Sequence, residues 1–200
     1  MAKRNNLILA TANAHKVREM QALLADCGWD VEAAPTGMAD IEETGSTFAE
    51  NAKIKALAVT AATGCIALAD DSGLMVDALN GEPGVHSKRW AGDQASDGAR
   101  IAKLLNALGS VPADDRSARF VCAACIAGPQ GVLWEGAGRV EGVIAGAPSG
   151  DGGFGYDPIF HIREAGCTMA CLSEQHKNAI SHRGRAISRA ADWLRSHLER

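Results

Sequence analysis

Two adjacent aspartates are the residues of this chain best suited to chemistry. The apolar run from Cys65 to Ala69 predicts a buried strand, and it ends in two acids, a hydroxyl and a glycine: Asp70, Asp71, Ser72 and Gly73. Adjacent carboxylates at the end of a buried strand are costly to desolvate unless a cation or a shared proton accompanies them. In open α/β sheets this edge is also where ligands bind. The sequence therefore predicts a divalent metal site with one carboxylate left to accept a proton.

A second candidate site is the segment from Thr11 to Lys16. It follows the short apolar run 6–10 and precedes a helical pattern, so we expect it where a strand turns into a helix. Backbone N–H groups at a helix start, with a hydroxyl, an amide and a lysine beside them, would bind phosphate. The spacing is not that of a Walker loop. The alternative, which the sequence leaves open, is that Asn13 only caps the helix.

An acidic loop and the helix after it supply further polar side chains. Glu42, in the loop 42–45, is either a metal ligand or a solvated acid. Asn51 and Lys55 are four residues apart in the helix, so they share a face and can point at one ligand. The alternative is a lysine that faces solvent.

The only dense glycine loop of the chain extends from Ser149 to Pro158. It contains Phe154, Asp157 and the single tyrosine, Tyr156. Glycines allow the backbone to approach a ligand closely, and an aromatic ring in such a loop can stack on a flat base. The alternative is a tight turn with Phe154 packed inward. Asp157 favours binding because it adds a polar group.

A basic segment from Lys177 to Arg183 is expected just before the last helix, with Ser181 as its N-cap. Cations at a helix start are unfavourable for the helix dipole, so an anionic ligand would explain Lys177, His182 and Arg183. A solvated basic turn is the alternative.

Length and composition limit the function classes. The chain has 200 residues, 46% of them hydrophobic, which suits one domain or one domain with a small lobe. Its formal net charge of −4 disfavours nucleic-acid binding. No apolar stretch approaches membrane-spanning length. We expect a soluble cytoplasmic protein without a membrane or nucleic-acid partner.

The six cysteines are expected to be buried free thiols. Cys122 and Cys125 lie in an apolar run that predicts a strand, where residues three apart point to opposite faces. One zinc ion could therefore not easily bind both. Disulfides are not expected in a cytoplasmic chain.

The remaining patterns predict strands and helices in alternation, then antiparallel strands. Expected strands are 6–10, 31–34, 119–127 and 132–144, the last two joined as a hairpin. Expected helices are 17–27 ended by Gly28, 47–63 opened by a Thr47–Glu50 capping box and ended by Gly64, 101–108, and 183–198 with Leu198 facing the core. This order predicts an α/β protein with a mixed sheet.

Sorted by charge, the candidate residues indicate a site for a metal ion and a nucleoside polyphosphate. The cations suited to several phosphates are Lys16, Lys55, Lys177 and Arg183. The acids Glu42, Asp70 and Asp71 are oxygen ligands suited to Mg²⁺, and Phe154 and Asp157 suit a base. No residues indicate a second substrate, so water is the expected nucleophile and one aspartate its proton acceptor.

Several segments, in order along the chain, resemble the motifs of the inosine/xanthosine triphosphate pyrophosphatase family. They are Thr11–Lys16, Glu42–Gly45, Phe48–Ala52 with Lys55, Ala69–Leu74, Gly81–Val85, Gly153–Phe160 and Lys177–Arg183. The resemblance covers almost the whole chain, and so many motifs in order are highly specific.

This resemblance implies a single domain over residues 1–200, with an elongated mixed β-sheet flanked by helices and two lobes with an active-site cleft between them. It implies hydrolysis of noncanonical purine nucleoside triphosphates (ITP, dITP and XTP) to the monophosphate and pyrophosphate. It also implies a requirement for Mg²⁺ and a homodimer.

The resemblance also gives individual residues a role. Glu42 and Asp71 would be metal ligands, and Asp71 the catalytic proton acceptor. The substrate-binding residues would be Thr11, Ala12, Asn13, Ala14, His15 and Lys16 for phosphates, Ser72, then Phe154, Gly155, Tyr156 and Asp157 for the base, and Lys177, His182 and Arg183 for base and phosphates. Lys55 and Asp70 would support them.

The chain departs from the family pattern at two places. Ala12 stands where the family often has glycine, and the run from His86 to Trp90 replaces a more usual tyrosine-containing run, which leaves the role of that segment open. Two other functions also stay open. A nucleotidyl- or phosphotransferase would leave ITP intact in water alone, and a nucleotide-binding protein without catalysis would be unaffected by Asp71→Asn.

Overall fold

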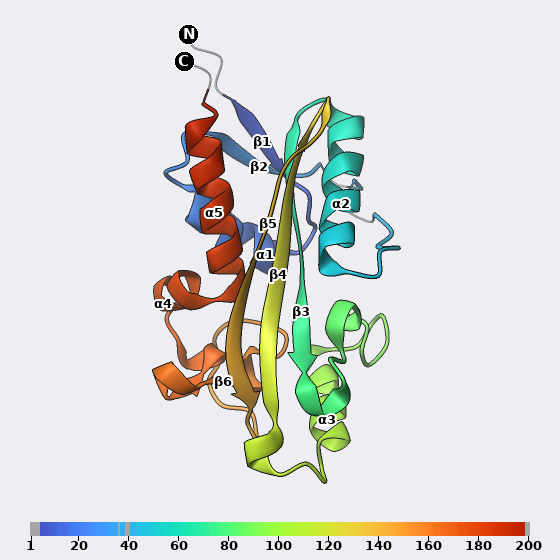
Figure 1. Cartoon of the computed structure of the whole chain (residues 1–200), viewed down its shortest axis with the longest axis vertical. Coiled ribbons are helices and arrows are strands. Elements are labelled where there is room, and N and C mark those ends of the chain that lie inside the picture. Colours follow the sequence, from blue (N-terminus) through green and yellow to red (C-terminus); the bar gives the residue numbers. More distant parts are fainter. Residues whose placement is uncertain (1–4, 36, 39–40, 199–200) are drawn as a thin grey trace. The chain divides into compact units, whose positions relative to one another are not determined.

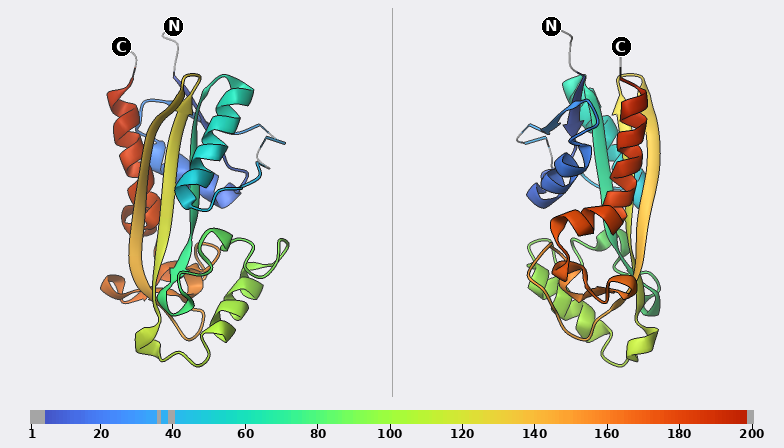
Figure 2. Two further views of the ribbon diagram at one scale, coloured as in Figure 1. Left: turned by 45° about the vertical axis from the view of Figure 1, so that its right-hand side comes forward. Right: turned by 90° about the vertical axis from the view of Figure 1, so that its left-hand side faces the viewer.

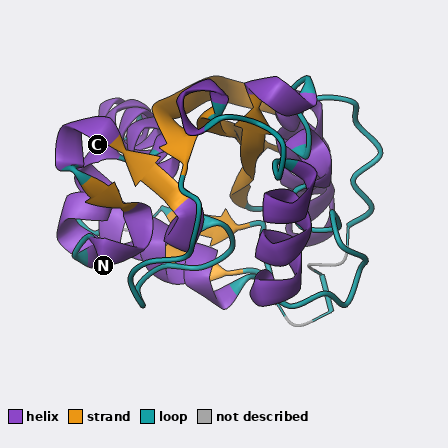
Figure 3. Ribbon diagram, turned by 90° about the horizontal axis from the view of Figure 1, so that it is seen from below, coloured by secondary structure: helices purple, strands orange, loops and turns teal. Residues whose placement is uncertain are grey.

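The computed structural model describes residues 5–35, 37–38 and 41–198, and the other residues are grey in Figures 1 and 3. The chain divides into two compact units. Unit 1 comprises Met1–Asp71, Cys122–Gly138 and Arg183–Arg200, and unit 2 comprises Ser72–Val121 and Arg139–His182. The single domain expected from the sequence stays a prediction.

The described strands form a mixed sheet, as the sequence predicts. They are β1 (Asn6–Leu9), β2 (Asp30–Ala33), β3 (Ile66–Val76), β4 (Ser117–Gly128), β5 (Gly131–Ile144), β6 (Phe160–Ile162) and β7 (Cys167–Thr168). Hydrogen-bonded neighbours follow the order β2-β1-β3-β4-β5-β6-β7. β1 is parallel to β2 and β3, whereas β6 is antiparallel to β5 and β7. The α-helices are α1 (Ala14–Leu24), α2 (Phe48–Thr63), α3 (Asp97–Ala107), α4 (Glu174–Ile180) and α5 (His182–Ser196).

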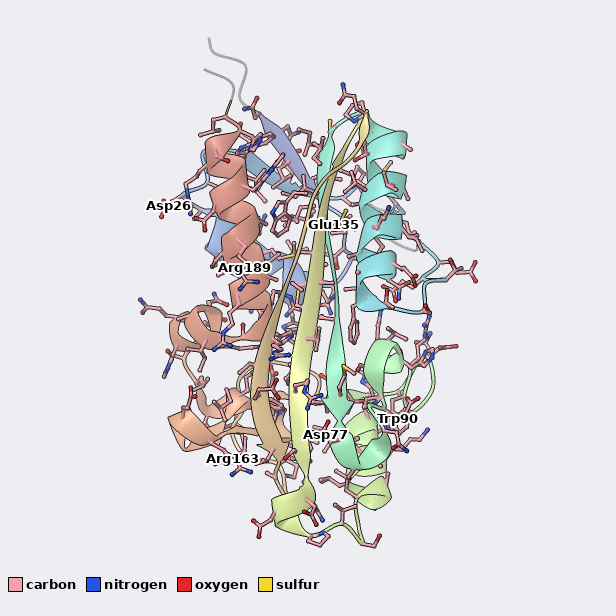
Figure 4. All side chains as sticks on the ribbon, viewed as in Figure 1. Asp26, Asp77, Trp90, Glu135, Arg163 and Arg189 are labelled. Carbon is pink, nitrogen blue, oxygen red and sulfur yellow. The ribbon has the colours of Figure 1, made fainter. Side chains whose placement is uncertain are left out.

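In unit 1, helices cover both faces of the strands. One buried cluster joins α1 and α5 to residues such as Leu7, Leu68 and Ile126, and a second joins α2 to the alternate residues Ile8, Ala67 and others. This alternation is what a strand buried on both sides requires. α2 and α5 accordingly lie on opposite sides of the strands in Figure 1. In Figures 1 and 2, α5 runs beside β5, where Arg189 (labelled in Figure 4) donates a hydrogen bond to the Ala137 carbonyl.

The predicted boundaries of α2 are confirmed. Thr47 accepts a hydrogen bond from the Glu50 N–H, and the Glu50 side chain accepts from the Thr47 N–H, which completes the capping box. Gly64 ends the helix in the left-handed conformation with φ of 70°. The helix start therefore fixes the acidic loop before it, because Ser46 also donates to Glu50.

Unit 2 has its own hydrophobic core. α3 contributes Ile101, Leu104 and Leu108 follows it, and these residues pack with Leu74 and Phe160 among others. The short strands β6 and β7 and the α4 helix also belong to this unit. The core thus includes the carboxyl-terminal part of the glycine loop 149–158, because Tyr156 and, directly after the loop, Ile159 are buried in it.

The prediction that a strand ends at the two aspartates is wrong. β3 continues through Asp70 and Asp71 to Val76. The acids do not break the strand because each carboxylate meets cationic or amide groups on its own side of the strand. Residues beyond them, such as Leu74, return to the core.

Other helices also differ from the predictions, and α3 begins at Asp97 rather than at Ile101. α1 ends at Leu24 rather than at Cys27, although Cys27 is buried and Gly28 has a positive φ of 82°. α4 was not predicted. Lys177 lies inside this helix, and Ser181 lies between α4 and α5.

Leu198 was expected to face the core, but it lies beyond α5 and is 38% exposed. Its side chain instead covers Gly28, where an added Cβ would lie 2.8 Å from a Leu198 methyl. The hairpin of β4 and β5 is confirmed, with Pro129 and Gln130 as the connection.

All six cysteines are free thiols, but the expected burial is confirmed only for Cys27, Cys122 and Cys125, since Cys65 and Cys167 are half-buried and Cys171 is exposed. The prediction for the CxxC pair is confirmed. Cys122 belongs to the core cluster under α1 and α5, and Cys125 to the cluster under α2. The two thiols therefore lie on opposite faces of β4. In the part of the chain that the structure describes, no helix combines the length and the apolar character needed to cross a membrane.

Candidate active site

Asp70 and Asp71 project to opposite faces of β3, because side chains alternate along a strand. Asp70 meets Lys16 from α1 and Arg183 from α5. Asp71 meets Asn51 and Lys55 from α2. All of these residues belong to unit 1. The strand thus separates the two carboxylates into two different polar clusters.

The first cluster, called the Asp70 cluster, consists of Asp70, Lys16, Arg183 and Glu19. Asp70 is fully buried, and its Oδ1 lies 3.1 Å from the Lys16 ammonium. Its Oδ2 accepts hydrogen bonds from Arg183 Nε and Nη2 at 3.2 and 3.1 Å. The second edge of the Arg183 guanidinium donates to Glu19 at 2.7 Å. Two cations and two carboxylates therefore hold one another in fixed positions.

The second cluster, called the Asp71 cluster, consists of Asp71, Asn51, Lys55 and Glu43. Asn51 donates to Asp71 Oδ2 at 3.1 Å, and its carbonyl accepts from the Gly45 N–H at 2.8 Å. Lys55 lies 3.3 Å from Asp71 Oδ1 and 2.6 Å from Glu43 Oε1. One ammonium is thus shared between two carboxylates.

The two aspartates consequently differ in their electrostatics. Burial by itself would raise the pKa of Asp70, but the charges of Lys16 and Arg183 outweigh it and hold that pKa well below its ordinary value. Burial raises the pKa of Asp71, Lys55 opposes this effect, and Glu43 adds to it, so the net pKa is raised. Asp70 is therefore a permanent anion, and Asp71 is the better proton acceptor.

The turn between β1 and α1 is shaped by its own side chains. Asn13 is the N-cap of α1 and accepts from the backbone N–H groups of His15 and Lys16. Thr11 Oγ1 accepts from the Asn13 N–H at 3.2 Å. The capping function that the sequence left open is thus present. Because the cap already binds two N–H groups, phosphate binding by this turn stays a prediction.

A pocket in unit 1 of about 670 Å³ borders this turn. Its lining combines the turn, one face of α1 and the segment after β2: Thr11, Ala12, Ala14, Val17, Arg18, Gln21, Ala33, Ala34, Pro35 and Gly37. It lies beyond the carboxyl ends of two parallel strands, where α/β sheets bind ligands. Lys16 is directed to Asp70 instead, although its side chain keeps 14% exposure.

The acidic loop reaches Lys55 through Glu43, while Glu42 is exposed. No sequence signal distinguishes the two adjacent glutamates. Asn51 has the larger role in the geometry, since it is buried and links the loop to Asp71. Its spacing of four from Lys55 was the signal for this contact, and the solvent-facing alternative for Lys55 is wrong.

The glycine loop forms the centre of a third cluster, in unit 2. Asp157, which opens the short η4 helix (Asp157–Ile159), is 3% exposed and accepts from Lys177 at 2.7 Å and from the Phe154 N–H at 2.9 Å. The Lys177 ammonium also lies 4.8 Å from the centre of the Phe154 ring. Phe154 and Asp157 were expected to contact a base, and the structure brings both of them to Lys177.

His182 and Arg183 are consecutive but belong to different clusters. His182 stacks on Phe120 in unit 2, with ring centres 4.7 Å apart and planes at 10°. Arg183 belongs to unit 1 and the Asp70 cluster. The chain passes from one unit to the other between His182 and Arg183, and again between Asp71 and Ser72. Each of these two pairs of predicted site residues therefore has one residue in each unit.

The donor groups fit a magnesium ion that also takes substrate oxygens. The described residues contain no group of three or more acids, histidines or cysteines able to hold a metal by themselves. Mg²⁺ is commonly bound by one or two carboxylates, with phosphates and water completing its six ligands. The carboxylates of Asp71 and Glu43, which share one ammonium, are oxygen donors of this kind.

Comparison with known proteins agrees with these features. The sequence model of the Ham1 family matches residues 7–193. A protein of Desulforamulus reducens named dITP/XTP pyrophosphatase is 50% identical over 190 residues, 94% of each chain. The structure of a HAM1 protein from Coxiella burnetii superposes with a TM-score of 0.87 at 46% identity, over 96% of this chain and 99% of that one. A Ham1 protein from Staphylococcus aureus gives a TM-score of 0.85 at 42% identity with the same coverage.

The fold and the polar clusters define an α/β protein in which two adjacent aspartates, on one strand of a mixed sheet, have pKa values shifted in opposite directions. The chain belongs to the Ham1 family. The resemblance noted in the sequence is thereby confirmed.

Proposed function

We propose that this protein hydrolyses noncanonical purine nucleoside triphosphates (ITP, dITP and XTP) between the α and β phosphates. The products are the nucleoside monophosphate and pyrophosphate. Relatives about half identical to this chain over nearly their whole length carry the name dITP/XTP pyrophosphatase, which supports this substrate class.

The observation that carries the proposal is that the pKa of Asp70 is lowered and that of Asp71 is raised. Hydrolysis of a polyphosphate needs fixed cations for the phosphate charge and a base for the attacking water. Asp70 orients Lys16 and Arg183 in the Asp70 cluster. Asp71 supplies the base: in the protein without metal its pKa is raised, so it accepts a proton more readily than Asp70 does.

In the proposed reaction, water attacks a phosphorus of the α–β bridge and the bridging P–O bond breaks. Asp71 takes the proton of that water, and Lys55 and Asn51 hold its carboxylate in place. Lys16 and Arg183 stabilise the charge that develops on the phosphates. Thr11, Ala12, Asn13, Ala14 and His15 would complete the phosphate contacts.

Mg²⁺ is the proposed cofactor. Asp71 and Glu42 would hold it, and Lys55, the ammonium that Asp71 and Glu43 share, would be the nearby cation. When bound, the ion would neutralise phosphate charge and lower the pKa of a nearby water.

The third cluster would bind the base. Phe154 would stack on the purine, and Asp157, Lys177 and His182 would provide polar contacts. Gly155, Tyr156 and Ser72 would shape the contact with the substrate. A cytoplasmic homodimer is also proposed, and the free thiols agree with a reducing compartment.

The test is incubation of the protein with ITP, Mg²⁺ and water only, followed by identification of products. We expect IMP and pyrophosphate, and we expect EDTA to stop the reaction. Release of orthophosphate would refute the cleavage position, and intact ITP would refute hydrolysis. Asp71→Asn should lose turnover and retain nucleotide binding, whereas the substitution Asp192→Asn, at an exposed aspartate of α5, should change neither turnover nor binding.

A further inference from the structure

Two hydrogen bonds join the glycine loop to the segment from η2 (Gly84–His86) to α3, within unit 2. The Gly155 N–H donates to Asp97 Oδ2 at 2.7 Å. The Tyr156 hydroxyl donates to the Ser87 carbonyl at 3.0 Å. This segment includes the run from His86 to Trp90, whose role the sequence left open.

Asp97 is well placed to hold the loop because it is itself fixed. It is the first residue of α3, which Ser96 caps by accepting from the Ala99 N–H. A carboxylate at a helix start is stabilised by the helix dipole. Arg100 forms an ion pair with the other Asp97 oxygen and donates to the Lys88 and Ala95 carbonyls at 3.0 and 2.5 Å. The Arg100 guanidinium thus links Asp97 to the His86–Trp90 run, through Lys88, and to the residue before the Ser96 N-cap, Ala95.

The loop needs such a support because of its glycines. Gly153 and Gly155 have positive φ values of 71° and 64°. A Cβ on Gly153 would lie 2.1 Å from Asp157 Oδ2, so no side chain fits there. Glycines lose more conformational freedom on ordering than other residues. Hydrogen bonds from outside the loop offset that cost.

Two consecutive backbone amides of the loop are therefore held by two carboxylates. The Phe154 N–H binds Asp157 inside the loop, and the Gly155 N–H binds Asp97 outside it. Bonds from N–H groups to ionised carboxylates are stronger than neutral ones. Together they fix the two peptide planes on either side of the Phe154 Cα, which bears the ring.

We infer that Asp97 is a positioning residue that, through the Gly155 amide, sets the placement of Phe154 and thereby the preference of the site for its purine base. Arg100 orients Asp97 for this role. The inference rests on the proposed function, since it names what selects the substrate of that site. It assigns the His86–Asp97 part of the chain the task of supporting the base-binding loop.

The test compares Asp97→Ala with Asp77→Ala. Asp77 (labelled in Figure 4) is a matched control, because it also opens a short helix of unit 2, η1 (Asp77–Leu79), and pairs with an arginine, Arg119. The side chains of Asp97 and Asp77 are 43% and 47% exposed. Amide hydrogen exchange of residues 153–156 is measured first, and then kcat and KM for ITP and GTP.

Asp97→Ala should speed exchange in the loop and raise KM for ITP about tenfold, with kcat changed by less than about twofold. The preference for ITP over GTP should narrow. Asp97→Asn, which keeps an acceptor for the Gly155 N–H, should recover most of the loss. Asp77→Ala should leave exchange in the loop and KM unchanged.

The inference is overturned if exchange in the loop rises no more in Asp97→Ala than in Asp77→Ala. It is also overturned if exchange rises but KM and substrate preference stay as in the wild type. A wild-type protein that leaves both triphosphates intact would refute the proposed function instead. In that case the exchange comparison still decides whether Asp97 holds the loop.

Discussion

Asp70 and Asp71 are neighbours on β3, but the carboxylate of Asp70 lies between two cations, whereas that of Asp71 shares one ammonium with Glu43. The same side chain is therefore stabilised as an anion at one position and destabilised at the next. This contrast yields opposite expectations for the two substitutions to asparagine.

Asp71→Asn should abolish turnover and stabilise the metal-free protein. Because the pKa of Asp71 is raised by burial, its ionised form weakens the native state above that pKa, and stability falls as the pH rises through it. A neutral amide removes this cost, while Lys55 keeps Glu43 as a partner. We expect the Tm at pH 7 to rise by roughly 2–4 °C, the shift that about 1 kcal/mol produces in a chain of this size. A lower Tm in thermal unfolding without metal would contradict this account.

Asp70→Asn should strongly destabilise the protein. It removes the fully buried carboxylate that lies against both Lys16 and Arg183, so Glu19 remains beside two cations. Breaking a buried pair costs about 3–5 kcal/mol. The depressed pKa of Asp70 gives stability that is present above the ordinary aspartate pKa and is lost as the pH falls below it. Urea unfolding at neutral and acidic pH should show a difference between wild type and variant that shrinks in acid. If the difference in unfolding free energy were the same at both pH values, the charge of Asp70 would not be the cause of the destabilisation.

Cysteine reactivity should be confined to Cys171 in the native protein. Hydrogen bonds from Thr168 and Ser149 lower its pKa, and it is exposed. Burial raises the pKa of Cys122, and it raises that of Cys125 to about 12. Brief treatment with iodoacetamide and peptide mass spectrometry should find the label at Cys171 first, and Cys171→Ser should remove most of it. Equal early labelling of Cys122 would show that β4 opens readily.

The Lys177–Asp157 pair should show strong energetic coupling. Both side chains are nearly fully buried and lie 2.7 Å apart. Lys177→Met and Asp157→Asn should each cost about 3–5 kcal/mol of unfolding free energy, because each removes the opposite charge 2.7 Å from a buried ionised group. The double variant should lose much less than the sum of the two. Additive losses in urea unfolding would indicate that the pair contributes little.

Local signals in the sequence were sufficient for the elements that depend on neighbours in the chain. The capping box of Thr47 and Glu50, the stop at Gly64 and the Asn51–Lys55 face are all present in the structure. They could be predicted because helix geometry fixes spacings of three and four residues.

Long-range partners were beyond such signals. The continuation of β3 through Asp70 depends on Arg183, which lies 113 residues further along the chain. The roles of Glu19, Glu43 and Asp97 likewise depend on which elements meet in the fold. The short α4 was missed because a helix of seven residues has too little periodicity to separate it from a loop.

Tyr156 is the only tyrosine of the chain, and its hydroxyl is buried against the Ser87 carbonyl. Burial raises its pKa, so the native phenol should resist ionisation in alkali until the loop opens. Ultraviolet difference absorbance of the phenolate would then come from one position alone. The protein thus has a built-in optical probe in its glycine loop, which needs no label.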